Sequence, residues 1–300
     1  MRVRTLAVGL LVSGLALATA ACGKSGSPTD NANAGAPPAL QVAKNVDVAG
    51  SPTFAKMKQR KHVIVGVKDA QPGLGYKDLT TGKYSGFDID IANYISAQLG
   101  FDPAKIEYKA VPSASREQAL VNGDVDYYVG TYTINDKRKK QVAFAGPYFV
   151  AGQDLLVRKD NTDITGPRSL MGKKVCSVTG STPIQNVRAK KLTQASNIVE
   201  YQKYSDCVTA LEQGKVDVLT TDDAILKGYA AQEPDKLKVV GKPFTKEPYG
   251  VGLPHDDKAL RDKVNDILQT AMDNGTWQKF YDETLGKSGS KATPPKLERY

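Results

Sequence analysis

Three short polar segments of the chain carry side chains that suit ligand binding. Thr131 lies eight residues after Gly123, and Asp222 lies eight residues after Gly214. Both lie where a buried strand is predicted to end. A hydroxyl and a carboxylate can hold the polar and cationic parts of a small molecule. The third segment, Gly180-Ser181-Thr182, precedes Pro183 and offers hydroxyls and free backbone N–H groups at a helix start, which favours an anion. The three segments together predict a polar ligand site.

An eight-residue pattern occurs twice and positions two of these segments. The copies are 119–126, with Gly123, and 210–217, with Gly214. Each copy predicts the end of a helix, a glycine turn and the start of a buried strand. Ligands of open α/β sheets bind outside the carboxyl ends of the strands. We therefore expect two similar α/β lobes with a ligand held between them.

Apolar periodicity predicts the same alternation of elements in both halves of the chain. In the first half we expect strands at 62–67 and 105–110, a helix at 88–99 and a short basic helix from Asn135 to Gln141. In the second half we expect strands at 174–178, 197–201, 216–221 and 249–253, and helices from 183 and at 205–213, 224–231 and 256–274. Thr182 is expected to cap the helix from 183, and Trp277, Phe280 and Tyr281 to pack in a core. Chain crossings near Ala151 and Pro248 predict a hinge.

The composition is that of a globular protein. Of 300 residues, 40% are hydrophobic and 24% are charged, which suffices for one or two ordinary cores. The net charge of +9 includes Arg2 and Arg4, and many lysines stand singly on amphipathic helices. Such scattered charge indicates a solvated surface, so we expect no nucleic-acid partner.

The N-terminus predicts export. Arg2 and Arg4 precede an apolar run at 6–18, and Thr19-Ala-Ala-Cys22 follows the run. The whole segment resembles a bacterial lipoprotein signal. That resemblance implies that 1–21 is removed and that Cys22 is acylated and anchors the chain to the membrane. Alternatively, an ordinary signal peptidase cleaves there and Cys22 is incidental. The low apolar content of 22–53 predicts a flexible tether, and 287–300 is expected to be a flexible tail.

The remaining cysteines, Cys176 and Cys207, form an even pair in a chain that is expected to reach an oxidising compartment. We predict that a disulfide joins the strand carrying Cys176 to the helix carrying Cys207. The alternative is two buried free thiols.

Signatures of catalysis are few. The chain has two histidines, His62 and His255, with no Cys/His metal spacing, no Gly-x-Ser-x-Gly elbow and no phosphate loop. We expect no metal, no cofactor and no enzymatic activity. Glu117 or Asp69 could still act as a general acid, so an enzyme on this fold stays an alternative. A sensory ectodomain that signals to a separate membrane chain is another.

From about residue 55 to about residue 286, the chain resembles family 3 bacterial solute-binding proteins, the polar amino-acid receptors of ABC importers. The matching segments, in order, are Tyr84–Ala92, Thr131–Arg138 running on to Phe144–Tyr148, and Val216–Asp223. The resemblance implies an α/β, two-lobed periplasmic-binding-protein-like fold (type II), with two α/β lobes joined by a two-crossing hinge. Lobe 1 would comprise 54–151 and 249–286, and lobe 2 would comprise 152–248.

The resemblance also implies roles for individual residues. Thr133 and Arg138 would hold the ligand α-carboxylate, which agrees with the bidentate pairing of guanidinium and carboxylate. Ser181 and Thr182 would complete that site, and Asp222 would receive the α-ammonium. As alternatives, Arg138 is one cation of a basic surface run, and Asp222 only caps a helix. We assign the ligand to Asp222 and the cap to Asp223.

Three further positions, Lys68, Arg116 and Tyr204, resemble those that contact the distal carboxylate in acidic amino-acid receptors. Each has an alternative as a surface cation or a packing aromatic. Counting Lys68, Arg116 and Arg138 against Asp222 gives a site of +2, and a neutral ligand would leave buried cations unpaired. We therefore expect an acidic amino acid, glutamate and also aspartate, carried by a monomer to an ABC permease that a separate ATPase powers.

Overall fold

The computed structural model describes residues 40–300. The predicted signal peptide and Cys22 lie outside the described residues. Between residues 40 and 300, no helix is both long and apolar enough to cross a membrane.

Lobe 1 is built on a five-stranded sheet of order β5-β1-β6-β13-β7. Its strands are β1 (Ile64–Val67), β5 (Glu107–Ala110), β6 (Tyr127–Tyr128), β7 (Val142–Ala151) and β13 (Glu247–Pro254). Strands β5, β1 and β6 are parallel, and β13 pairs antiparallel with both β6 and β7. Three short strands form a separate antiparallel sheet beside it: β2 (Ala70–Gln71), β3 (Gly75–Lys77) and β4 (Tyr84–Ser85).

Lobe 2 repeats this plan in a sheet of order β10-β9-β11-β8-β12. Its strands are β8 (Gln153–Arg158), β9 (Val175–Val178), β10 (Ile198–Tyr201), β11 (Val218–Asp222) and β12 (Leu237–Val239). Strands β10, β9 and β11 are parallel, and β8 joins them antiparallel. The expectation of two similar α/β lobes is confirmed.

Helices flank these sheets. The α-helices are α1 (Pro52–Arg60), α2 (Phe87–Gln98), α3 (Arg116–Val121), α4 (Asp136–Lys139), α5 (Thr182–Ala189), α6 (Tyr204–Glu212), α7 (Asp223–Gln232), α8 (Lys258–Asp273) and α9 (Thr276–Glu283). Short 3-10 turns occupy Pro103–Lys105, Ser113–Ser115, Pro167–Ser169, Ala195–Asn197 and Leu285–Ser288. Gly123 and Gly214 follow α3 and α6 with φ of 73° and 69°, the left-handed turn that the repeated pattern predicts.

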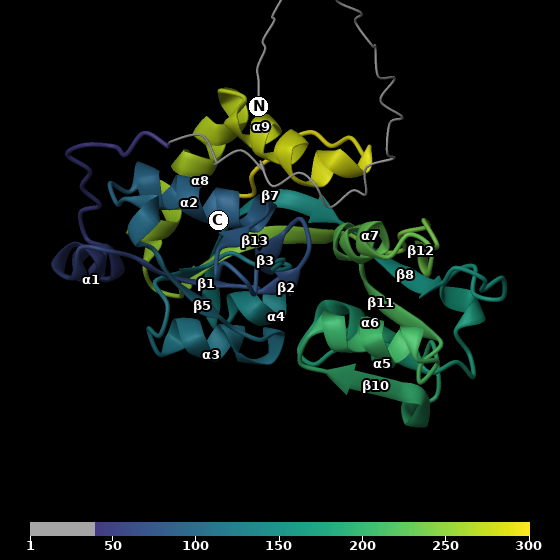
Figure 1. Ribbon diagram of the computed structural model, residues 1–300. Coiled ribbons are helices and arrows are strands. Elements are labelled where there is room, and N and C mark those ends of the chain that lie inside the picture. The colour runs from purple at the N-terminus through teal and green to yellow at the C-terminus, as the bar shows by residue number, and fades with distance from the viewer. Residues whose placement is uncertain (1–39) are drawn as a thin grey trace, which may run out of the picture. The chain divides into compact units, whose positions relative to one another are not determined.

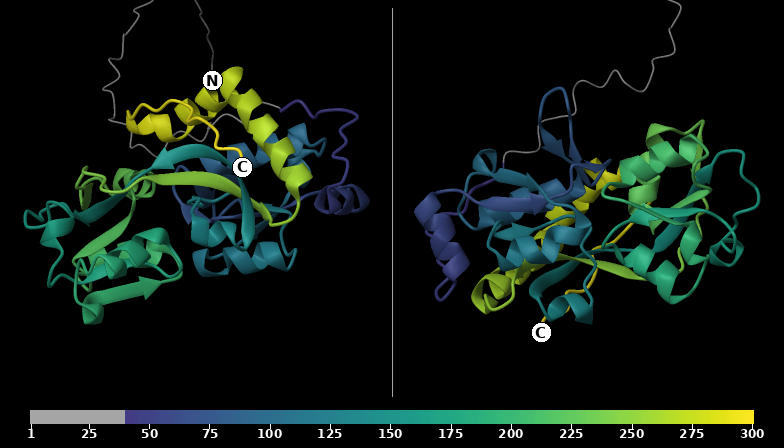
Figure 2. Two further views of the ribbon diagram at one scale, coloured as in Figure 1. Left: turned by 180° about the vertical axis from the view of Figure 1, so that it is seen from behind. Right: turned by 90° about the horizontal axis from the view of Figure 1, so that it is seen from below.

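Aromatic rings build the core of lobe 1. Phe87 of α2 contacts Tyr148 and Phe149 of β7, and Trp277 and Tyr281 of α9. The indole Nε1–H of Trp277 donates to the carbonyl oxygen of Tyr148 at 2.7 Å. Helices α8 and α9 therefore lie over the sheet on the β7 side, as Figure 2 shows.

The chain crosses between the lobes twice, and both crossings involve long strands. It leaves β7 for β8 through Gly152, and it returns from β12 to β13 over 240–246. Glu247 at the start of β13 pairs with Ala151 at the end of β7, so the two crossings lie side by side (Figure 1). Their positions agree with the predicted hinge.

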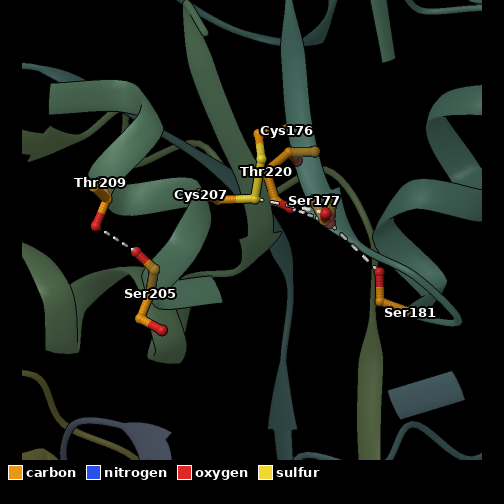
Figure 3. Close-up of a disulfide and its surroundings, with 7 residues drawn as sticks. All are labelled: Cys176, Ser177, Ser181, Ser205, Cys207, Thr209 and Thr220. Carbon is orange, nitrogen blue, oxygen red and sulfur yellow. Dashed lines mark hydrogen bonds between the residues drawn. A yellow bond between two sulfur atoms is a disulfide. The ribbon is translucent and has the colours of Figure 1, made fainter. Parts of the chain in front are cut away.

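A disulfide joins Cys176 of β9 to Cys207 of α6, as expected (Figure 3). Beside it, the Ser177 hydroxyl donates to the carbonyl oxygen of Thr220 at 2.7 Å. The disulfide therefore fastens the first turn of α6 to β9, the neighbour of the central strand of the lobe 2 sheet.

The segments next to the termini have contacts that composition did not indicate. In the expected tether, Val48 is buried and the Ala43 N–H donates to the carbonyl oxygen of Ala97. In the expected tail, residues 290–300 form neither helix nor strand, but Leu297 is buried. The Tyr300 ring lies against cations of lobe 1, among them Arg261 at 4.5 Å from its centroid.

Two helix caps differ from the sequence prediction. Ser181, rather than Thr182, caps α5, because its hydroxyl accepts from the Ile184 N–H. Asp223 is the first residue of α7 and not its cap; its carboxylate accepts from the Gly152 N–H and pairs with Lys227. Asp222 occupies the capping position without a capping bond, which leaves its carboxylate for other contacts.

Candidate ligand-binding site

Most of the predicted site residues meet at one point between the lobes. A small cavity of about 10 Å³ lies there, scarcely the room of one water molecule. It is lined by Ser113, Arg116, Thr131, Thr133, Ser181, Thr182, Pro183, Tyr204 and Asp222. A second cavity, of about 170 Å³, adjoins Lys68 and also reaches Tyr204. Side chains of both lobes therefore fill the centre of the site, and the larger space lies on the Lys68 side.

Thr131 follows β6 in a backbone conformation that is rare for a β-branched residue, with φ of 46°. Its N–H donates to Oδ2 of Asp88 at 3.0 Å, and the Tyr148 hydroxyl donates to Oδ1 of the same carboxyl at 2.7 Å. Burial raises the pKa of Asp88 to about 6. This buried acid fixes the loop that leads from β6 into the site.

Arg138 is buried, whereas its neighbours Lys137 and Lys140 are exposed, so it is not a surface cation. Asn135 caps the short helix α4 and accepts from the Arg138 N–H. The guanidinium donates to the carbonyl oxygen of Thr133 at 2.7 Å and, across the lobes, to that of Gly180 at 3.1 Å. Burial, followed by the nearby Arg116, lowers its pKa to about 10.

A carboxylate of lobe 1 pairs with this guanidinium. Arg138 Nε lies 3.2 Å from Oε1 of Glu117, on α3. Glu117, a candidate general acid in the sequence, here balances the charge of Arg138.

Arg116 and Lys68 are also buried, and both lie on lobe 1. The Arg116 guanidinium lies 4.2 Å from the ring centroid of Tyr132 and donates to the carbonyl oxygen of Thr131 at 3.3 Å. Lys68 Nζ donates to Ser113 Oγ at 2.9 Å and to the carbonyl oxygen of Val111 at 3.2 Å. Burial first, and Arg116 second, lower the pKa of Lys68. Lys68 thus points inward and is not a surface cation.

Asp222 ends β11 with one carboxylate oxygen satisfied. The Tyr249 hydroxyl donates to its Oδ2 at 2.6 Å, whereas Oδ1 is buried and has no hydrogen-bond partner among the described residues. Burial, with Glu247 as the second cause, raises the pKa of Asp222 to about 8. A buried carboxylate oxygen without a partner is suited to an added cation, such as an ammonium group.

Tyr204 is buried at the start of α6, one turn before the disulfide-bonded Cys207. Burial and the negative charge of Asp222 raise the pKa of its hydroxyl to about 12, so it is neutral at ordinary pH. The predicted residues of lobe 2 therefore come from three elements, the starts of α5 and α6 and the end of β11.

Glu247 is a site residue that the sequence analysis missed. It is buried, and its Oε2 accepts from the hydroxyls of Thr133 at 2.9 Å and Thr182 at 2.7 Å. Alternation along β13 places Glu247 on the same face as Tyr249, which also contacts the site. The local sequence carries no signal for Glu247, because the predicted strand begins only at residue 249.

This finding changes the charge count. Glu117 and Glu247 add two negative charges, so the +2 counted from the sequence becomes zero when every group is ionised. Among residues 40–300, no group of three His, Cys, Asp or Glu side chains could hold a metal ion.

Contacts between the lobes surround the site. The Lys203 ammonium of lobe 2 lies 2.7 Å from the Asp69 carboxylate of lobe 1, and the Tyr229 hydroxyl donates to the carbonyl oxygen of Ala70. Gly180 lies so close to lobe 1 that a Cβ there would come within 2.7 Å of Ala114 Cα. The two lobes are therefore closed on each other.

Two similar α/β lobes that close over a charged site at their strand ends define a two-lobed small-molecule-binding protein. Residues 63–287 match bacterial extracellular solute-binding proteins, family 3, and the chain belongs to this family. Proteins of this family are extracytoplasmic.

The named relatives differ from one another in the ligand that their names give. The chain is 42% identical over 236 residues to the glutamate-binding protein GluB of Corynebacterium efficiens, covering 75% of this chain and 79% of that protein. It is 38% identical over 233 residues to the glutamine-binding protein GlnH of Bacillus subtilis, covering 78% of this chain and 84% of that protein. Among solved structures, an ancestral arginine-binding protein bound to arginine superposes with a TM-score of 0.69 at 35% identity, covering 75% of this chain and 98% of that one. Each of these relatives has a name that describes it as a binding protein.

Proposed function

We propose that the protein is the solute-binding component of an ABC importer and that it binds an acidic amino acid, glutamate and also aspartate, between its lobes. Family membership and the 42% identity to a glutamate-binding protein support this proposal. The 38% identity to a glutamine-binding protein makes the neutral amide the competing ligand. The choice between them depends on the charges in the site.

The observation that carries the choice is that two buried cations lack an ion-pair partner. In the part of the chain that the structure describes, Arg138 pairs with Glu117, but neither Lys68 nor Arg116 lies within 4.0 Å of a carboxylate oxygen. Their contacts are hydroxyl and carbonyl oxygens and, for Arg116, the rings of Tyr128 and Tyr132. A buried cation is costly unless an anion balances it. The second carboxylate of an acidic amino acid would supply that charge, and an amide would not.

The proposed binding mode assigns one group of the ligand to each part of the site. The α-carboxylate would lie against Arg138 and the start of α5, where backbone N–H groups and a guanidinium converge. The α-ammonium would pair with the free Oδ1 of Asp222. The distal carboxylate would face the cavity beside Lys68. The full set of proposed ligand-binding residues is Lys68, Arg116, Thr131, Thr133, Arg138, Ser181, Thr182, Tyr204 and Asp222.

Calorimetric titration with glutamate, aspartate, glutamine, asparagine, arginine and histidine tests this function. We expect Lys68→Met and Arg116→Met each to weaken the binding of glutamate by about 30-fold or more, because each removes one of the two cations proposed to balance the buried distal carboxylate. Glutamine should be affected far less. Lys203→Met is the matched control, since Lys203 lines the same cavity but pairs with Asp69, so it should affect both ligands alike. Equal weakening of both ligands by the Lys68 and Arg116 variants would contradict acidic specificity.

Delivery to a permease and anchoring at the membrane complete the proposal. Ligand that binds the closed lobes more tightly than the open ones shifts the protein toward closure, which a permease can recognise. We propose that Cys22 carries the lipid anchor, that the protein acts as a monomer and that it leaves its ligand chemically unchanged. Cys22→Ser should release the protein from the cell membrane, and bound amino acid should be recovered intact from the purified protein.

A further inference from the structure

Glu247 lies where the two lobes and the two chain crossings meet. It is the first residue of β13 and is 5% exposed. Its Oε2 accepts from Thr133 of lobe 1 at 2.9 Å and from Thr182 of lobe 2 at 2.7 Å, and the two hydroxyl oxygens are 3.3 Å apart. One carboxylate oxygen therefore links a hydroxyl from each lobe.

The protons of this cluster can be counted. A hydroxyl has one proton to donate, and an ionised carboxylate can only accept. When Thr133 and Thr182 both donate to Glu247, each has only lone pairs left for another partner. The α-carboxylate of an amino acid is also an acceptor, so the same hydroxyls cannot donate to it at the same time.

We propose that Glu247 competes with the α-carboxylate of the ligand for the hydroxyls of Thr133 and Thr182, and thereby limits the affinity of the site; this rests on the proposed function. Glu247 is a positioning residue, since it acts through the two hydroxyls. Ligand binding then requires that the hydroxyls turn from Glu247 toward the ligand.

The surroundings of Glu247 favour a stable competitor. The Thr245 hydroxyl donates to its other oxygen, Oε1, at 2.7 Å, which holds the carboxylate in place. Thr245 itself accepts from the Gln153 N–H of β8, so this support extends into lobe 2. Hydrogen bonds to a charged acceptor are stronger than neutral ones, so breaking two of them opposes ligand binding.

Glu247→Gln tests the competition with little change of shape. The amide nitrogen can donate to the threonine oxygens, which leaves both hydroxyl protons for the ligand, and the negative charge beside the α-carboxylate is removed. We expect the dissociation constant for glutamate to fall about tenfold. Glu247→Asp keeps the charge but draws the carboxylate back by one methylene, so it should give a smaller gain. Glu233→Gln, at the end of α7 and beside Lys236, is the control for loss of a glutamate charge and should leave affinity unchanged.

The ligand can be varied as well as the protein. The α-amide of glutamate presents N–H donors where glutamate has an acceptor, and these can bond to Glu247 or to the threonine lone pairs. The Glu247→Gln variant should therefore gain affinity for glutamate but not for its α-amide. Titration calorimetry on the full chain gives both constants, with circular dichroism showing that each variant is folded.

The outcomes separate the two proposals. Wild-type protein that binds glutamate, together with a Glu247→Gln variant whose affinity is unchanged or weaker, overturns the competition alone. If Glu247→Gln does not fold, the same result for Glu247→Asp overturns it. Wild-type protein that binds none of the amino acids overturns the proposed function and this inference with it.

Discussion

Replacing Asp222 with asparagine should stabilise the ligand-free protein while removing its ability to bind an amino acid. Burial and the neighbouring Glu247 raise the pKa of Asp222 from 3.8 to about 8. Below pH 3.8 the carboxyl is protonated in both the folded and the unfolded chain. Between pH 3.8 and 8 the unfolded chain ionises and the folded chain keeps the proton. The stability of the wild-type protein therefore falls as pH rises through this window.

The size of the effect at pH 7 follows from the interval between the unfolded pKa and that pH. This interval is about three pH units, and each unit corresponds to about 1.4 kcal/mol, so ionisation lowers the stability of the wild-type protein by at most about 4 kcal/mol. Asparagine does not ionise, but its amide takes the place of an Oδ1 that has no partner, at a cost of about 1 to 3 kcal/mol. We expect a net gain of about 2 kcal/mol, or about 4 to 8 °C in unfolding temperature.

Urea denaturation followed by circular dichroism measures this difference on protein dialysed out of denaturant to remove bound amino acid. Between pH 5 and 8, the stability of Asp222→Asn minus that of wild type should rise with a slope approaching about 1.4 kcal/mol per pH unit, then level off. Asp235→Asn, at an exposed turn, controls for loss of a carboxylate. Parallel pH curves for Asp222→Asn and wild type would refute the reasoning.

Two further predictions concern closure and the disulfide. A Cβ on Gly228 of α7 would overlap the carbonyl oxygen of Pro72 in lobe 1, so Gly228→Ala should weaken ligand binding at least about tenfold by calorimetry. Because alanine favours a helix by about 1 kcal/mol over glycine, thermal unfolding without ligand should occur at the same or a higher temperature; unimpaired binding would contradict the contact. Loss of the disulfide in Cys176→Ala/Cys207→Ala should lower stability to urea by about 3.5 kcal/mol, since the bond spans a separation of 31 residues. Alkylation of wild type without reductant should leave its mass unchanged, and two added alkyl groups would disprove the bond.

The sequence predicted those parts of the site that follow from local pattern. Gly123 and Gly214 follow their helices in a conformation that glycine adopts readily, so the sequence alone predicted the repeated helix, turn and strand. Thr131 and Asp222 were then found from the general position of ligands at strand ends. These inferences needed no knowledge of distant contacts.

Glu247 could not be found in this way. It stands between Lys246 and Pro248, in a segment that reads as a polar loop. Its burial depends on pairing with Ala151 and on hydroxyls from both lobes, all of which are distant in sequence. The charge of +2 inferred from the sequence was incomplete for the same reason.

The expected tether at 22–53 shows the same limit. Its composition predicted a tether, yet Ser51 caps α1 and its hydroxyl donates to Asp257 at 2.7 Å. The partner lies 206 residues further along the chain. Composition measures how much apolar surface a segment can bury by itself, and not whether a remote part of the chain offers it a partner.

The place of β13 in the lobe 1 sheet affects the order in which the two lobes can assemble as successive parts of the chain become available to fold. Residues 153–239 supply every strand of the lobe 2 sheet in one continuous stretch, so that sheet can form before the C-terminal part of the chain is available to fold. The lobe 1 sheet is completed later, because β13 lies between β6 and β7 and is the last strand in the sequence. Domains commonly fold from the N-terminus onward. Here lobe 1 begins first in the chain, but its sheet is completed after that of lobe 2. Until residues 247–254 are available, β6 and β7 remain unjoined, and the chain carries an incomplete lobe 1 sheet.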